Sequence, residues 1–129
     1  MQLSPTAGLV AIALAAISSP ALADIGGAWH VTGEISGRNF VVDCRFDPKG
    51  TQFGGQCISL STGDDKVKAG KSYKLTKGAV SGDQILWTYQ TTVLFMGVDI
   101  NYAGTLKGDH INGTISAGGR KGNFSAIRK

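Results

Sequence analysis

The chain has 129 residues, a formal net charge of +4 and 19 glycines. This length predicts a single domain, and no segment after residue 23 has helical periodicity of useful length, which argues against a helical protein. Because most basic residues are scattered, the positive charge is interpreted as a contribution to solubility, with contact to an anionic envelope surface as the alternative, and no nucleic-acid partner is predicted.

Residues 1–23 differ in composition from the rest of the chain. The nearly continuous apolar run from Leu9 to Ile17 is followed by Ser-Ser-Pro and then by Ala21-Leu22-Ala23. This order is typical of a secretory signal peptide cleaved after Ala23, and the run is too short to span a bilayer comfortably. We therefore predict an exported domain of residues 24–129, periplasmic or secreted, without a transmembrane segment. No Lys or Arg precedes the run, so retention of the segment as an anchor stays open.

After residue 23, short runs of alternating apolar and polar residues are separated by turns rich in glycine. The alternating runs cover residues 28–35, 40–46, 51–60, 72–77 and 84–91, and three more lie between 98 and 128. Alternation with period two is the pattern of β-strands that are buried on one face. The sequence therefore predicts an all-β fold, and successive hairpins without a long crossover favour an antiparallel up-and-down (meander) barrel of about eight strands over a sandwich.

The two cysteines, Cys44 and Cys57, lie 13 positions apart. An even number of cysteines in an exported chain predicts a disulfide. Closing a loop of this length contributes about 3 kcal/mol to stability in the chain-entropy model. The spacing is not C-x-x-C and no cluster of ligands lies nearby, so neither a metal site nor a redox role is predicted.

Two further segments carry turn or loop signals. Residues 61–70 are the most polar segment and are predicted to form a mobile loop. Residues 78–85 and 104–111 share the pattern G-x-[VL]-x-G-D-x-I. In each copy the Gly-Asp pair is predicted to form a hairpin turn. Neither copy opens a helix, so the repeat is not a phosphate-binding loop.

Gly27-Ala28-Trp29 in the first alternating run and Arg128 in the last resemble the G-x-W…Arg pairing of the calycin superfamily, which includes lipocalins, avidins and fatty-acid-binding proteins. The closing run is also similar to the tails of small exported bacterial barrels of undefined function. The resemblance implies that Trp29 packs at the closed end of the barrel, with the guanidinium of Arg128 over its indole face. It implies no activity.

Few residues could carry catalytic chemistry. His30 and His110 are the two side chains that titrate near neutral pH, and both are predicted to lie on the surface. The aspartates fall in turns or on the outward face and form no acid–base couple, and no G-x-S-x-G motif occurs. We therefore predict no catalytic residues, no cofactor and no enzymatic activity.

Three aromatic residues are candidates for ligand contacts inside the barrel. Barrels of this size are either filled by side chains or hold one small ligand. The candidates, which offer flat walls to an apolar ligand, are Trp87, Tyr89 and Tyr102. Glycines at inward positions would make room for such a ligand; these are Gly33, Gly55, Gly104 and Gly113. The alternative is a packed core in which the glycines accept neighbouring aromatic rings.

The segment Thr92–Gly97 contains four consecutive large apolar residues, Val93, Leu94, Phe95 and Met96. If the segment is a hairpin end, it exposes an apolar patch that contacts a ligand, a partner or a membrane. The alternative is that the two flanking strands run longer and bury alternate residues.

The favoured function is that of a binding module for a small hydrophobic ligand, with these aromatic residues and the Val93–Met96 rim as contacts. A protein partner, as for a protease inhibitor, is the alternative, although the segment Asp24–Gly27 is short for an inserting trunk. An envelope protein without a ligand is a third possibility. The sequence does not predict an oligomeric state or the identity of a ligand.

Overall fold

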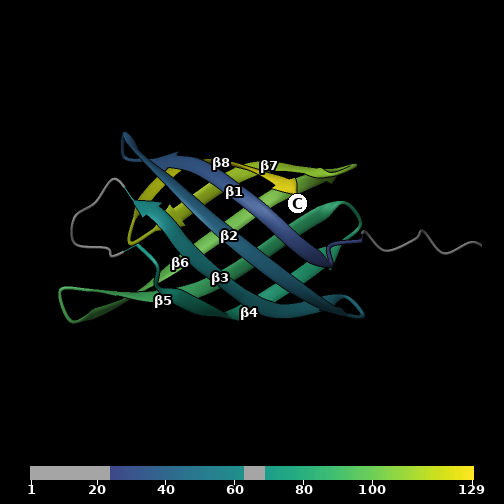
Figure 1. Cartoon of the computed structure of the whole chain (residues 1–129), viewed down its shortest axis with the longest axis horizontal. Helices are drawn as coiled ribbons and strands as arrows, with labels where there is room; N and C mark the ends of the chain where they lie inside the picture. Colours follow the sequence, from purple (N-terminus) through teal and green to yellow (C-terminus); the bar gives the residue numbers. More distant parts are fainter. Residues whose placement is uncertain (1–23, 63–68) are drawn as a thin grey trace, which may run out of the picture.

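The computed structural model describes residues 24–62 and 69–129. The predicted signal peptide and most of the predicted mobile loop lie outside these residues. The strands are β1 Gly27–Ile35, β2 Arg38–Lys49, β3 Gln52–Thr62, β4 Ser72–Ser81, β5 Gln84–Val93, β6 Met96–Lys107, β7 His110–Ala117 and β8 Arg120–Arg128. Each strand pairs with the next in antiparallel fashion, and β8 pairs with β1, so the sheet closes into a barrel (Figure 1). The predicted eight-stranded up-and-down barrel is confirmed.

The alternation in the sequence places one side of every strand in the interior. In β2, for example, Phe40, Val42 and Phe46 are buried, whereas Arg45 and Asp47, on either side of Phe46, are exposed. Side chains of successive strand residues point to opposite faces, so an apolar residue at every second position fills the barrel, and the outer surface is mainly polar, with Ile58, Leu60, Leu86 and Ile127 among the exposed apolar exceptions.

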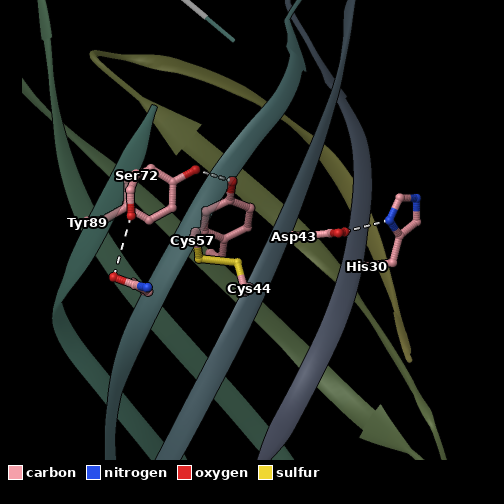
Figure 2. Close-up of a disulfide and its surroundings, with 8 residues drawn as sticks. His30, Asp43, Cys44, Cys57, Ser72 and Tyr89 are labelled. Carbon is pink, nitrogen blue, oxygen red and sulfur yellow. Dashed lines mark hydrogen bonds and ion pairs between the residues drawn. A yellow bond between two sulfur atoms is a disulfide. The ribbon is translucent and has the colours of Figure 1, made fainter. Parts of the chain in front are cut away.

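The predicted disulfide between Cys44 and Cys57 is present. The two residues are direct partners across β2 and β3, with their Cα atoms 4.0 Å apart. Both side chains are buried, and Figure 2 shows the sulfur atoms joining the two neighbouring strands. A disulfide of this kind fits an extracellular or periplasmic protein.

One end of the barrel, called the closed end here, is covered by Arg128. Its guanidinium lies 4.4 Å from the centre of the Trp29 ring. The same guanidinium donates hydrogen bonds to the backbone oxygens of Gly26 (2.6 Å) and Asp24 (2.7 Å) and to Oδ1 of Asp109 (2.8 Å). The arrangement is the one that the Gly-x-Trp and arginine pattern predicted.

Replacement of Arg128 by alanine is expected to lower the free energy of unfolding by about 1–2 kcal/mol, because it removes the cation–π contact and the packing of the side chain over Trp29. Urea denaturation followed by circular dichroism measures the effect. Lys121→Ala, which removes an exposed cation from the same strand, serves as the control with little expected change. An unchanged stability of Arg128→Ala would show that Arg128 does not hold the closed end.

Aromatic rings fill the middle of the barrel. Trp87 stacks on Tyr102 with ring centres 4.6 Å apart, and Phe46 and Phe124 contact Trp87 at 5.0 and 5.3 Å. Of the predicted inward glycines, Gly33 accepts an aromatic ring, because a Cβ atom on it would lie 2.5 Å from the ring of Phe40. A Cβ atom on Gly55, Gly104 or Gly113 would instead collide with the backbone of a neighbouring strand. The packed-core alternative, in which a glycine accepts a neighbouring aromatic ring, is therefore confirmed at Gly33, and at the other three positions the close neighbours are not aromatic rings.

Candidate ligand-binding cavity

A cavity of about 380 Å³ lies at the other end of the barrel, called the open end here. The turns that join β1 to β2, β5 to β6 and β7 to β8 surround this end. Most of the lining side chains are apolar or aromatic: Ile35, Phe40, Val42, Tyr73, Tyr89, Val93, Leu94, Val98, Ile100, Tyr102, Ile115 and Ala117. The barrel is thus filled toward the closed end and hollow toward the open end, because the large rings of the core stop at the level of the tyrosines.

The structure separates the predicted ligand contacts into two groups. Tyr89, Tyr102, Val93 and Leu94 line the cavity. Trp87 does not, since it is completely buried between Tyr102 and the phenylalanines of the core.

The remaining two predicted contacts, Phe95 and Met96, lie at the tip of the β5–β6 hairpin and outside the cavity. For the segment Thr92–Gly97, the structure combines the two predicted alternatives, an exposed apolar hairpin end and longer flanking strands. The strands run longer than predicted, to Val93 and from Met96, and the tip nevertheless exposes Phe95 completely and Leu94 by 66%. Figure 1 shows this hairpin projecting beyond the rim of the open end.

The turn at this tip has an unfavourable backbone conformation. Leu94 and Phe95 have φ angles of 51° and 69°. Hairpin turns of this type are usually formed by Asn and Gly, because bulky residues are strained at positive φ. Strained residues of this kind are concentrated at binding sites and switches, and here they form part of the rim.

Hydroxyl groups supply the polar contacts within the cavity. The Tyr89 and Tyr102 hydroxyls are 2.8 Å apart, and Thr91 Oγ1 donates to the Tyr73 hydroxyl at 3.3 Å. Ser59 also lines the cavity and is only 4% exposed, yet its Oγ has no hydrogen-bond partner among the described residues. Most buried hydroxyls in proteins have a hydrogen-bond partner, and a ligand or a water molecule in the cavity could supply one to Ser59.

Burial raises the pKa of two tyrosines of the cavity, Tyr89 and Tyr102. Desolvation raises the pKa of Tyr89 to about 12, the hydrogen bond with Tyr102 opposes this rise, and electrostatic interaction with the nearby Tyr73 adds to it. Burial also raises the pKa of Tyr102 well above its ordinary value, with smaller contributions of the same sign from Tyr89 and Tyr73. Ionising either Tyr89 or Tyr102 in the folded protein is therefore more costly than ionising an exposed tyrosine.

The raised pKa of Tyr89 predicts a loss of stability at high pH. Below about pH 10, the ordinary pKa of tyrosine, the hydroxyl is protonated in both the folded and the unfolded states and contributes no pH dependence. Between pH 10 and about 12, only the unfolded state releases the proton, so stability falls, by about 3 kcal/mol for this group. Urea denaturation across this range measures the loss, and Tyr89→Phe is the control with a smaller slope. Phenolate absorbance that rises near pH 10 for every tyrosine of the folded protein would contradict the prediction.

The other lining residues were not predicted as ligand contacts from the sequence, and those with polar groups among them include Arg38, Ser59, Tyr73 and Arg120. The alternation of inward and outward positions in the sequence could have identified the two arginines. Arg38 has the parity of Phe40 along β2, and Arg120 has that of Phe124 along β8, so each occupies an inward-facing position of its strand.

The histidines lie away from the cavity. His30 Nδ1 is 2.7 Å from Oδ1 of Asp43 on the outer surface, and Lys129 Nζ is 2.8 Å from the other oxygen (Figure 2 shows the histidine pair). Burial opposes ionisation of Asp43, but the hydrogen bonds from Lys129 and His30 outweigh it, so the pKa of this carboxyl lies below its ordinary value. His110 is exposed at the start of β7. Residues 24–62 and 69–129 contain no group of three side chains arranged to bind a metal ion.

The comparisons with known proteins give no relative from which a function could be transferred. The chain matches no family model, and no curated protein is significantly similar to it. Within the described part of the chain, no helix is long and apolar enough to cross a membrane. The cavity at the open end is therefore the feature on which a function can be argued.

Proposed function

We propose that the protein is an exported, calycin-like binding module that holds a small hydrophobic ligand in the cavity at its open end. The observation that carries the proposal is a cavity of about 380 Å³ with a mainly apolar and aromatic lining. Ligand pockets typically measure about 300–1,000 Å³ and combine such a lining with a few polar groups. Export is supported by the buried Cys44–Cys57 disulfide.

The Ser59 hydroxyl, which has no hydrogen-bond partner among residues 24–62 and 69–129, supports the same function. An unsatisfied buried polar atom destabilises a protein by about 1–3 kcal/mol. A ligand that supplies a hydrogen-bond partner to Ser59 removes this penalty, and its apolar part gains free energy by leaving water. No catalytic role is proposed for any residue of the cavity.

Titration with N-phenyl-1-naphthylamine, a neutral apolar fluorophore, tests the proposal. We expect saturable binding of one molecule per chain with a blue shift of its emission. Ala117→Trp places a large ring in the cavity and is expected to abolish binding, because Ala117 lines the cavity wall near the β7–β8 turn. Ser116→Trp, one residue earlier and outside the lining, is the matched control. Absence of binding by the unaltered protein, or equal binding by Ala117→Trp, would refute the proposal.

A protein partner is the second candidate, and it is favoured by the exposed β5–β6 tip with Phe95 and Met96. An inhibitor that inserts its N-terminal segment is less well supported. Asp24 and Gly26 are bound by Arg128, and the Ile25 side chain is buried in the core. Residues 24–26 therefore belong to the closed end of the barrel rather than to a free trunk.

A further inference from the structure

The hydroxyl groups that line the cavity within the described residues come from four neighbouring strands. They belong to Ser59 on β3, Tyr73 on β4, Tyr89 and Thr91 on β5, and Tyr102 on β6. All five residues are buried. The strands β1, β2 and β7 instead contribute mainly apolar side chains: Ile35, Phe40, Val42, Ile115 and Ala117. The cavity therefore has a hydroxyl wall, formed by β3 to β6, and an apolar wall.

The hydroxyl wall is continuous across its four strands. The rings of Tyr73 and Tyr89 are stacked with their centres 5.0 Å apart, and Tyr102 follows at 5.8 Å from Tyr89. Ser59 extends this row onto β3. Cys57 pairs with Tyr73, so Ser59, two residues further along the same face, is the diagonal neighbour of Tyr73. A ligand in the cavity therefore has several hydroxyl groups on one side.

The hydroxyl wall contains more hydrogen-bond donors than it uses. Each hydroxyl has one proton to donate. One hydrogen bond joins Tyr89 and Tyr102, and Thr91 donates to Tyr73, so two of the five protons are used. The proton of Ser59, that of Tyr73 and one of the tyrosine pair have no acceptor among residues 24–62 and 69–129. Unused buried donors are rarer in proteins than unused acceptors, so an acceptor is the group that this wall lacks.

A neutral acceptor suits the hydroxyl wall better than an ionised one. Removing a carboxylate from water costs far more free energy than removing a neutral carbonyl group, and hydroxyl groups alone do not neutralise its charge. The same loss of hydration raises the pKa of Tyr102. An environment that disfavours negative charge on this ring also disfavours it on a ligand beside the ring.

We propose that the ligand is a neutral molecule with a carbonyl group on an apolar body, as in a ketone, ester or amide. Its carbonyl oxygen accepts a hydrogen bond from Ser59 Oγ, and its apolar body packs on the apolar wall, where it gains free energy by leaving water. This inference rests on the proposed function, because it concerns the ligand of the same cavity.

Displacement of N-phenyl-1-naphthylamine by three chain-matched competitors tests the inference. The competitors are methyl octyl ketone, the alkene in which a CH2 group replaces the ketone oxygen, and decanoate. Because the alkene leaves water more readily than the ketone does, the quantity to compare is the change in the ketone-to-alkene affinity ratio on mutation. Ser59→Ala is expected to lower this ratio by about threefold to tenfold, the effect of one hydrogen bond. Decanoate, which is ionised at neutral pH, is expected to bind more weakly than the ketone.

Ser61→Ala is the matched control for Ser59→Ala. Ser61 lies on the same strand, but it is exposed and lies outside the cavity lining. Its replacement is expected to leave the affinity ratio unchanged. In the absence of ligand, Ser59→Ala is expected to keep or raise the urea midpoint of the protein, because it removes a buried hydroxyl without a partner among the described residues.

Infrared spectroscopy of the ketone with an isotope-labelled carbonyl group observes the contact directly. A hydrogen bond weakens the C=O bond, so the stretching frequency of the bound ketone is expected to lie below its value in hexane. In Ser59→Ala the frequency is expected to move back toward the hexane value, and in Ser61→Ala it is expected to stay where it is in the unaltered protein.

The outcomes distinguish this inference from the function on which it rests. An unchanged affinity ratio in Ser59→Ala, a C=O frequency equal to that in hexane, or a lower urea midpoint of ligand-free Ser59→Ala would each refute the carbonyl contact. Tighter binding of decanoate than of the ketone would refute a neutral ligand. A hydrophobic binding module remains in all these cases, whereas failure of the unaltered protein to bind the fluorophore refutes the proposed function itself.

Discussion

Replacement of Trp87 by alanine is expected to lower the free energy of unfolding by about 3–5 kcal/mol, the range measured for removal of large aromatic side chains from protein cores. Trp87 is completely buried, and its ring contacts Phe46, Tyr102 and Phe124 within 5.3 Å. Removal of the ring leaves a hole in the middle of the barrel that these neighbours cannot close. Urea denaturation measures the loss.

Trp87→Phe provides a sharper comparison. The indole Nε1 of Trp87 is buried without a hydrogen-bond partner among the described residues. Phenylalanine keeps most of the apolar contact and removes this unsatisfied donor, which offsets part of the lost packing. We therefore expect Trp87→Phe to destabilise the protein by less than half as much as Trp87→Ala. Equal losses for the two variants would show that the donor has a partner and that packing around the indole is not the main contribution.

Simultaneous replacement of Cys44 and Cys57 by alanine is expected to lower stability by about 3 kcal/mol, because the unfolded chain regains the freedom that the disulfide removes. The bridge spans 13 positions and lies between directly paired residues of β2 and β3. Thermal and urea denaturation with and without dithiothreitol measure the effect.

The double variant, which has no disulfide, shows whether dithiothreitol affects stability in any way other than by reducing the disulfide. Dithiothreitol is expected to lower the stability of the unaltered protein to near that of the variant, and to leave the variant unchanged. If the variant is as stable as the oxidised protein, the hairpin does not depend on the disulfide, and its contribution to the fold has been overestimated.

The strand pattern could be predicted from the sequence because every strand of this barrel is buried on one face. The inward positions of β2 and β8, from Phe40 to Phe46 and from Phe124 to Arg128, follow directly from the alternation. The end of the β5–β6 hairpin could not be decided in advance. Leu94 and Phe95 are poor residues for a tight turn, and the pairing of Thr92 with Gly97 and of Val93 with Met96 is a property of the folded sheet.

The candidate site could be predicted only in part. The period of two identifies Tyr89 and Tyr102 as inward residues, and both line the cavity. It does not give the position of a residue along the barrel axis, which is set by the register between strands. Trp87 is as inward-facing as Tyr89 but lies closer to the closed end, where Phe46 and Phe124 fill the space around it.

The closure by Arg128 also determines how the protein can be attached to other structures. Asp24 and Lys129 both lie at the closed end, since Arg128 binds the Asp24 backbone and the Lys129 amide donates to Ala28 at 2.9 Å. A tether joined to either residue therefore leaves the cavity facing away from the support. Coupling to a sensor surface through Lys129, or display from a membrane through a segment preceding Asp24, would present the binding site to the solution.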